Sequence, residues 1–71
     1  MWIYLSGSNM AINTDHVTRF YVEETGSGAA LKADVSGKTM MVTYHESKAE
    51  AVAALAKLME KREANMAVMR F

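Results

Sequence analysis

The chain has 71 residues, 51% of them hydrophobic, and its eight basic residues balance eight acidic ones, so it carries no formal net charge. It contains no cysteine, which excludes disulfides and thiolate metal sites, and two histidines are too few for a convincing structural metal site. The balanced charge argues against a nucleic-acid partner without excluding a local basic patch, because contact with phosphates usually needs a basic face.

The small size of the chain points to assembly. A domain this short buries only about 60% of the surface that its unfolded chain exposes, so its stability should be marginal. Small domains compensate with disulfides, a metal or oligomerisation, and only the last route is open here, so we expect a homo-oligomer. The longest apolar run falls far short of the roughly 20 residues that cross a bilayer. The N-terminus also lacks the basic segment of a signal peptide, and we therefore expect a cytoplasmic protein without a membrane partner.

The first part of the chain consists of short β-prone runs separated by turn residues, which is typical of strands. Three strands are expected, at Trp2–Leu5, Met10–Asn13 and Val17–Glu24. The Ser-Gly-Ser-Asn sequence at residues 6–9 predicts a turn, and the polar residues 13–16 predict a loop or bend. These signals indicate a β-rich N-terminal half.

The next two strands follow after further turns. Residues 26–28, Gly-Ser-Gly, predict a flexible turn into a strand at Ala29–Val35. Residues 36–38 predict a tight hairpin into a strand at residues 39–44. Short connections between successive strands favour an antiparallel meander over a parallel sheet.

After Tyr44 the period of the apolar residues changes from two to 3.6, which marks a helix. Ser47 and Glu50 fit the S-x-x-E capping box at its start, and Asn65 is a suitable stop, so the helix should occupy residues 49–64. The sequence thus predicts an α+β domain over residues 1–65, an antiparallel β-meander of four to five strands with one C-terminal amphipathic helix packed on one face. The helical residues expected to pack on the sheet are Ala51, Val52, Leu55, Leu58 and Met59.

Residues 66–71 form an apolar C-terminal tail, in which five of the six side chains are apolar. Such a segment is costly to leave in water. It could extend the helix, add as a strand to a sheet edge of its own chain or of a neighbour, or stay disordered. The sequence leaves these three alternatives open.

Chemistry-bearing residues are sparse. Asp15, His16, His45 and Glu46 are the only group that a metal or acid–base site could use, and their spacing matches no known ligand pattern. The Gly-Ser-Gly turn lacks the lysine and the helix start of a phosphate loop, and no serine lies in a nucleophile elbow. We therefore expect no catalytic, cofactor-binding or metal-binding residues, and we do not expect an enzyme.

Aromatic and methionine side chains give the clearest functional signal. One helix covers only one face of a sheet. If Ile3 and Leu5 face the helix, the neighbouring aromatic residues point to the uncovered face, where aromatics and methionine are typical of protein interfaces. A strand register displaced by one residue would instead place them in the core. The candidate interface residues are Trp2, Tyr4, Tyr21, Met41, Met66, Val68, Met69 and Phe71.

Two functions are compatible with this pattern. The first is a non-enzymatic interaction module that self-associates through the open sheet face or the C-terminal tail. The alternative is a nucleic-acid-binding regulator, in which Trp2, Tyr4 and Tyr21 stack on bases while Arg19 and Lys32 contact phosphates. The balanced charge favours the first.

A weak likeness to a known family runs through these turn and core positions. The chain contains Ile3-x-Leu5-x-Gly7, then Ile12-Asn13-x-Asp15-x-Val17-x-x-Phe20, and later Gly37-Lys38, Val42 and Glu50-Ala51. Over residues 3–58 this string resembles the small FlbD-type flagellar-operon proteins and related uncharacterised short bacterial proteins. The chain departs from it at residues 22–30, where the flagellar pattern has a proline-containing turn. The resemblance implies a small β-rich bacterial domain with a C-terminal helix, and it implies no activity.

Overall fold

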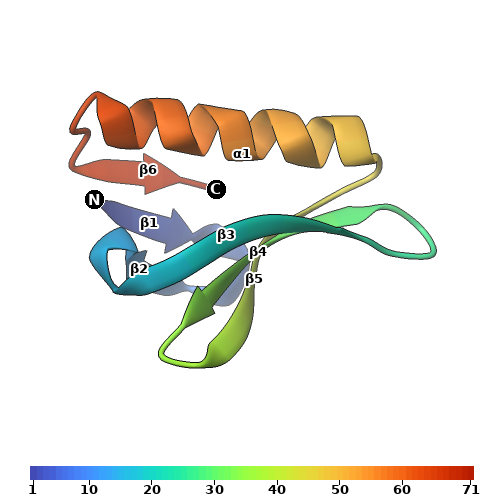
Figure 1. Ribbon diagram of the computed structural model, residues 1–71, viewed down its shortest axis with the longest axis horizontal. Coiled ribbons are helices and arrows are strands. Elements are labelled where there is room, and N and C mark those ends of the chain that lie inside the picture. The colour runs from blue at the N-terminus through green and yellow to red at the C-terminus, as the bar shows by residue number, and fades with distance from the viewer.

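Two three-stranded sheets and one helix make up the fold in the computed structural model, which describes residues 1–71 (Figure 1). The first sheet, called here the β1 sheet, has the strand order β2-β1-β6. Strand β1 pairs antiparallel with β2 and parallel with β6. A 3-10 turn at Ser6–Ser8 (η1) joins β1 to β2. The three strands are β1 (Trp2–Leu5), β2 (Met10–Asn13) and β6 (Val68–Arg70).

The second sheet, called the β4 sheet, is an antiparallel meander in the order β3-β4-β5. A second 3-10 turn (η2, Thr14–His16) leads into it, and the Asn13 side chain accepts a hydrogen bond from the backbone N–H of Asp15 at 3.0 Å there. Ser36 and Gly37 both have positive φ, as a two-residue type I′ hairpin requires. The strands are β3 (Val17–Glu24), β4 (Ala29–Val35) and β5 (Lys38–His45).

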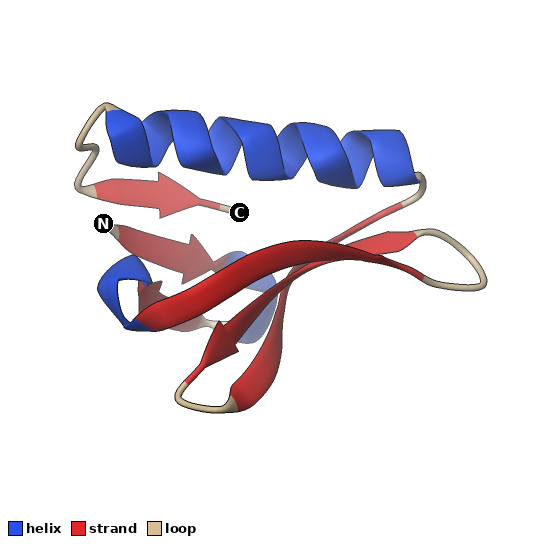
Figure 2. Ribbon diagram, in the orientation of Figure 1, coloured by secondary structure: helices blue, strands red, loops and turns tan.

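Helix α1 (Lys48–Glu63) begins and ends one residue before the predicted bounds of 49 and 64. The Ser47 hydroxyl accepts a hydrogen bond from the backbone N–H of Glu50 at 3.2 Å, and Asn65 takes the left-handed conformation just beyond the helix. The helix packs against all three strands of the β4 sheet and runs beside β6 (Figures 1 and 2). With charged residues along its 16 residues, α1 is neither long nor apolar enough to span a membrane.

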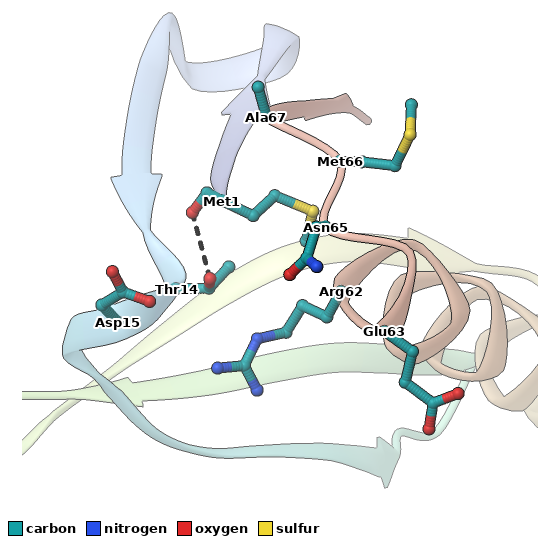
Figure 3. A pocket seen from close by; sticks show the side chains of 8 residues that line it. All are labelled: Met1, Thr14, Asp15, Arg62, Glu63, Asn65, Met66 and Ala67. Carbon is teal, nitrogen blue, oxygen red and sulfur yellow. Dashed lines mark hydrogen bonds between the residues drawn. The ribbon is translucent and has the colours of Figure 1, made fainter.

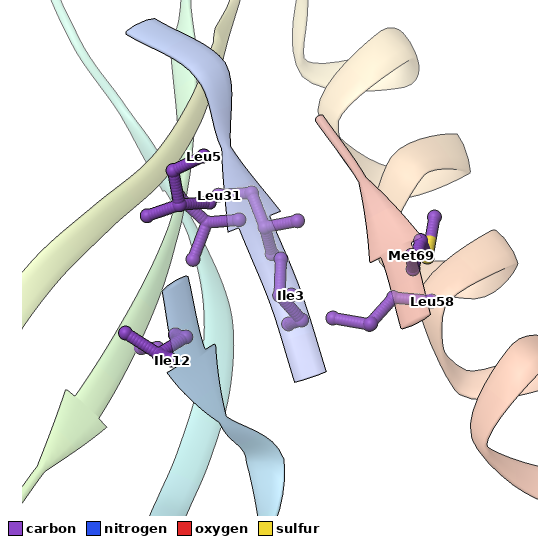
Figure 4. Close-up of a cluster of buried hydrophobic side chains, with 8 residues drawn as sticks. Ile3, Leu5, Ile12, Leu31, Leu58 and Met69 are labelled. Atoms are coloured by element: carbon purple, nitrogen blue, oxygen red, sulfur yellow. The ribbon is translucent and has the colours of Figure 1, made fainter. Parts of the chain in front are cut away.

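The core lies where the β1 sheet, the β4 sheet and α1 meet (Figure 4). Ile3, at the centre of β1, is fully buried and is the register partner of both Ile12 and Met69. Leu31 of β4 and Leu58 of α1 are also fully buried. The remaining members of the core cluster are Leu5, Ala33 and Val42.

The prediction of an α+β meander with one C-terminal helix is confirmed. The structure also answers the question of whether residues 66–71 form a helix, a strand or a disordered tail. Residues 66–71 contain β6, which pairs with β1 of its own chain. Backbone hydrogen bonds from Trp2 N–H to Ala67 O and from Phe71 N–H to Tyr4 O, both 2.9 Å, hold it there. The six strands form two sheets rather than one. The 3-10 turn η2 lies between β2 and β3, where the chain passes from the first sheet to the second.

One member of the predicted helical stripe does not pack. Val52 is 46% exposed, whereas Ala51 and Leu58 are buried and Leu55 is half-buried. Successive helical residues turn by about 100°, so Val52 lies a quarter turn away from Ala51 and beyond the row that meets the sheet. The prediction that Val52 packs on the sheet is wrong.

Candidate interaction surface

The outer face of the β1 sheet carries the exposed aromatic residue of the chain's first strand. Strand side chains alternate between faces, so with Ile3 in the core, Trp2 and Tyr4 point outward. Trp2 is 50% exposed and its register partner Val68 is 48% exposed, which places two apolar side chains next to each other in water. We call this surface the Trp2 face; its members are Trp2, Tyr4, Ala11, Asn13, Val68 and Arg70.

Arg70 is the one charged residue on the Trp2 face. Its guanidinium carbon lies 5.6 Å from the centre of the Tyr4 ring, a cation–π distance. The Tyr4 hydroxyl donates a hydrogen bond to the side-chain oxygen of Asn9 at 3.2 Å. Tyr4 is therefore positioned both through its hydroxyl and through its ring. Trp2 makes no such hydrogen bond or cation–π contact, and it is the most exposed aromatic side chain of the face.

The outer face of the β4 sheet is different because it is covered by ion pairs. Two guanidinium nitrogens of Arg19 contact Asp34 Oδ2 at 2.9 and 3.0 Å, and Thr39 donates a hydrogen bond to the other oxygen of Asp34 at 3.0 Å. Lys32 pairs with Glu23 at 3.0 Å, and this hydrogen bond raises the pKa of the Lys32 ammonium. Water solvates these four charged side chains readily.

Tyr21 and Met41 lie on this charged face and not beside Trp2. Tyr21 and Met41 are both register partners of Lys32, one from each side. Arg19 stacks over the Tyr21 ring at 4.2 Å, which leaves the ring half-buried, whereas Met41 is 58% exposed. The structure thus divides the predicted interface between two sheets.

The residues of the C-terminal segment have three different environments. Val68 belongs to the Trp2 face, and Met66, also exposed, precedes it in the loop after α1. Phe71 is half-buried against the core cluster. Met69 is only 8% exposed and packs with Ile3, so its side chain belongs to the core and not to the surface where the sequence placed it. The alternation of β6 explains this, since Met69 faces inward when Val68 and Arg70 face outward.

A cavity of about 430 Å³ opens between the end of α1 and the start of the chain (Figure 3). Thr14, which is buried in its wall, donates a hydrogen bond to the backbone oxygen of Met1 at 3.0 Å. Arg62 extends into the cavity from the helix, and Asp15 lies on the opposite wall. Charges of both signs line this open cavity, and no buried polar group is left without a partner to attract a ligand.

A second hollow, of about 370 Å³, lies between η1 and β5. We call it the β5 groove. Leu5 and Val42 are its buried apolar residues, and Phe71 and the exposed side chains of Met41 and Tyr44 also line it. None of its nine lining residues has a charged side chain. Local sequence patterns cannot reveal this groove, because its two walls are more than thirty residues apart in the chain.

The polar candidates for a metal or acid–base site do not come together. Asp15 and His16 lie in η2, whereas His45 ends β5 and its Nε2 is 2.6 Å from the hydroxyl of Thr43. No group of three or more histidine or acidic residues gathers anywhere in the chain. The predicted candidates are therefore divided between η2 and the end of β5.

Comparisons with known proteins add no assignment: no family model, curated protein or solved structure matches the chain.

Proposed function

We propose that this protein is a non-enzymatic interaction module that self-associates through the Trp2 face. The supporting observation is the contrast between its two open sheet faces. Two ion pairs, Arg19–Asp34 and Lys32–Glu23, lie on the outer face of the β4 sheet beside the exposed Met41. The Trp2 face instead exposes Trp2 and Val68 side by side with a single charge, that of Arg70. An exposed apolar patch of this kind is a typical protein contact site.

The energetics favour covering this face. Fully burying a large apolar side chain that was fully exposed stabilises by about 1.5–3 kcal/mol, and the half-exposed Trp2 and Val68 would each contribute part of this value in a self-contact. Tryptophan is also enriched among the residues that dominate binding energy at interfaces. A chain of 71 residues without disulfides gains most from such a contact because its own core is small.

The position of residues 66–71 limits which surface the proposed contact can use. Its backbone pairs with β1 of the same chain, while Val68 and Arg70 contribute side chains to the Trp2 face. Two residues of the tail are therefore part of the open face, and a free tail is not needed for the contact.

The nucleic-acid alternative receives less support from the same geometry. Arg19 and Lys32, its proposed phosphate ligands, are already paired with Asp34 and Glu23. Trp2 lies on the β1 sheet and Tyr21 on the β4 sheet, so they do not form one stacking platform. A single-stranded nucleic-acid site needs both stacking aromatics and free cations along one groove.

The decisive experiment is sedimentation velocity over a range from low to high micromolar protein, with a matched pair of variants. Val68→Lys places a charge on the Trp2 face, and Val52→Lys places the same charge on α1 at a valine of nearly equal exposure, 48% against 46%. We expect the wild type and Val52→Lys to associate with rising concentration and Val68→Lys to stay monomeric. A wild type that remains a monomer throughout, or a Val68→Lys variant that associates equally well, contradicts the proposal.

The setting of the protein is part of the proposal. We place it in the cytoplasm of a bacterium, on the basis of the FlbD-like residues. The likeness to FlbD-type proteins rests on those residues alone.

A further inference from the structure

We propose that two copies of this chain form a dimer by exchanging strand β6, so that residues 66–71 of each copy pair with β1 of the other. The structure itself shows what occupies the place beside β1, because the same residues fill it within one chain. This inference goes beyond the proposed contact through the Trp2 face. It uses the backbone of β6 and the inward side chain of Met69, and the outward side chains take no part.

The attachment of β6 is confined to one place. Its only strand neighbour is β1. Besides the two backbone hydrogen bonds given above, the Ser6 N–H donates to the Phe71 oxygen at 3.0 Å, and the Ser6 hydroxyl donates to the same oxygen at 2.7 Å. Met69 adds its packing against Ile3 in the core. A second copy has the same residues and makes each of these contacts equally well, which is why strand exchange is a low-cost route to a dimer.

A single turn connects β6 to α1. Asn65 in this turn has a φ of 56°, in the left-handed region that is unfavourable for a residue with a side chain. The Asn65 N–H donates to the Arg62 oxygen and the Met66 N–H donates to the Lys61 oxygen, both at 3.1 Å, as in the Schellman motif that ends a helix. This turn reverses the direction of the chain, so that β6 runs back along α1 and beside β1 (Figure 1).

The residues around this turn also suit a continued helix. Residues 64–69 contain neither glycine nor proline, and alanine and methionine are strong helix formers. When Asn65 takes the right-handed conformation instead, its strain is released, α1 continues past its present end, and the following residues point away from their own β1. They are then free to pair with β1 of another copy. Short connections under strain favour this kind of exchange.

Exchange between two copies is reciprocal. Each chain gives one β6 and receives one, so every contact closes within a dimer and neither β1 is left as a free edge. The tether favours pairing within one chain at low concentration, and a second copy competes at about millimolar concentration. Because β6 must first leave β1, folded chains exchange slowly. We therefore expect exchanged dimers after the chain is refolded at high concentration.

Two variants of the turn test the inference in the Val68→Lys background, in which a charge opposes contact through the Trp2 face. Asn65→Val disfavours the left-handed turn because its Cβ is branched, and Asn65→Gly is the matched control that favours the turn. Both are refolded from urea at about millimolar concentration and then diluted for sedimentation velocity. We expect a dimer-to-monomer ratio about tenfold higher for Asn65→Val. Equal ratios for the two variants overturn the inference.

A mixture of isotope-labelled and unlabelled wild-type chains gives a measurement that needs no variant. The two are refolded together at high concentration, and an isotope-filtered nuclear Overhauser experiment then detects only contacts between different copies. We expect a signal between the side chains of Ile3 and Met69, which both face the core and do not meet across two Trp2 faces. Dimers without this signal, or the absence of dimers after refolding, overturn the exchange.

The outcomes separate this inference from the proposed function. If the exchange fails, folded wild-type chains still associate through the Trp2 face and folded Val68→Lys chains still do not. If folded wild-type chains stay monomeric at every concentration, contact through the Trp2 face fails, and the signal between Ile3 and Met69 after refolding still decides the exchange.

Discussion

Gly28 shows how much a single position can constrain this fold. A Cβ at residue 28 would clash with the backbone oxygen of His45 and lie 2.6 Å from the Tyr44 hydroxyl. That hydroxyl is also hydrogen-bonded to Ser27 at 2.7 Å, so the ring is held over the turn. The glycine is needed for this close approach between the β3–β4 turn and the end of β5.

Gly28→Ala should therefore destabilise the protein by about 1–3 kcal/mol, because the added methyl group overpacks a site with no free space. Gly26→Ala is the matched control in the same turn, since no atom lies within 4 Å of a Cβ there. Urea unfolding of both variants checks the prediction. Equal midpoints for the two variants would mean that Tyr44 does not pack over Gly28 in solution.

The sequence predicts the turn at residues 26–28 but not the unequal roles of its two glycines. Both fit the local turn chemistry equally well. What distinguishes them is Tyr44, sixteen positions beyond Gly28, and a contact at that range leaves no local signal. The same limit applies to Arg19 and Lys32, whose pairing with Asp34 and Glu23 depends on strand register.

At the level of elements, α1 is the helix that closes the core. Leu58 is fully buried against both sheets, whereas Val52 of the same helix is half in water. Hydrophobicity alone does not separate them, because both belong to the apolar stripe that the sequence predicts. The position of each residue around the helix axis decides which of them is covered, because Leu58 lies on the same face as Ala51 and Val52 lies about 100° away from it.

Leu58→Ala should cost about 2–5 kcal/mol, because it removes a buried side chain and leaves a cavity. In a domain of this size that is much of the total stability, so partial unfolding is expected. Val52→Ala should change the free energy of unfolding only slightly. Thermal unfolding followed by circular dichroism compares the two, and similar losses would contradict the observed orientation of the helix.

Strand positions, turns and the capped helix could be predicted because each has a local pattern, such as the Ser47–Glu50 capping box. The parallel pairing of β6 with β1 could not, because it joins the two ends of the chain through residues that also suit a helix. The division of the strands into two sheets could not be predicted either, because it also depends on contacts between residues far apart in the chain. It separated Tyr21 and Met41 from Trp2, and alternation in β6 moved Met69 into the core.

At the scale of the whole molecule, the outer faces of the two sheets differ in the side chains that they expose. The outer face of the β4 sheet exposes two ion pairs and Met41, and the outer face of the β1 sheet exposes Trp2 and Val68 with one charged residue, Arg70. Neither net charge nor composition could show this, because both average over the two faces. The proposed self-association requires Trp2 to be exposed in the single chain, as observed, and covered in an oligomer.

Quenching of the only tryptophan by acrylamide tests this claim most directly, since the emission comes from Trp2 alone. At low micromolar concentration the half-exposed indole should be quenched readily. As the protein concentration rises, we predict that the quenching constant falls and that the emission shifts to shorter wavelength, with Val68→Lys showing neither change. A quenching constant that stays the same at every concentration would contradict the account.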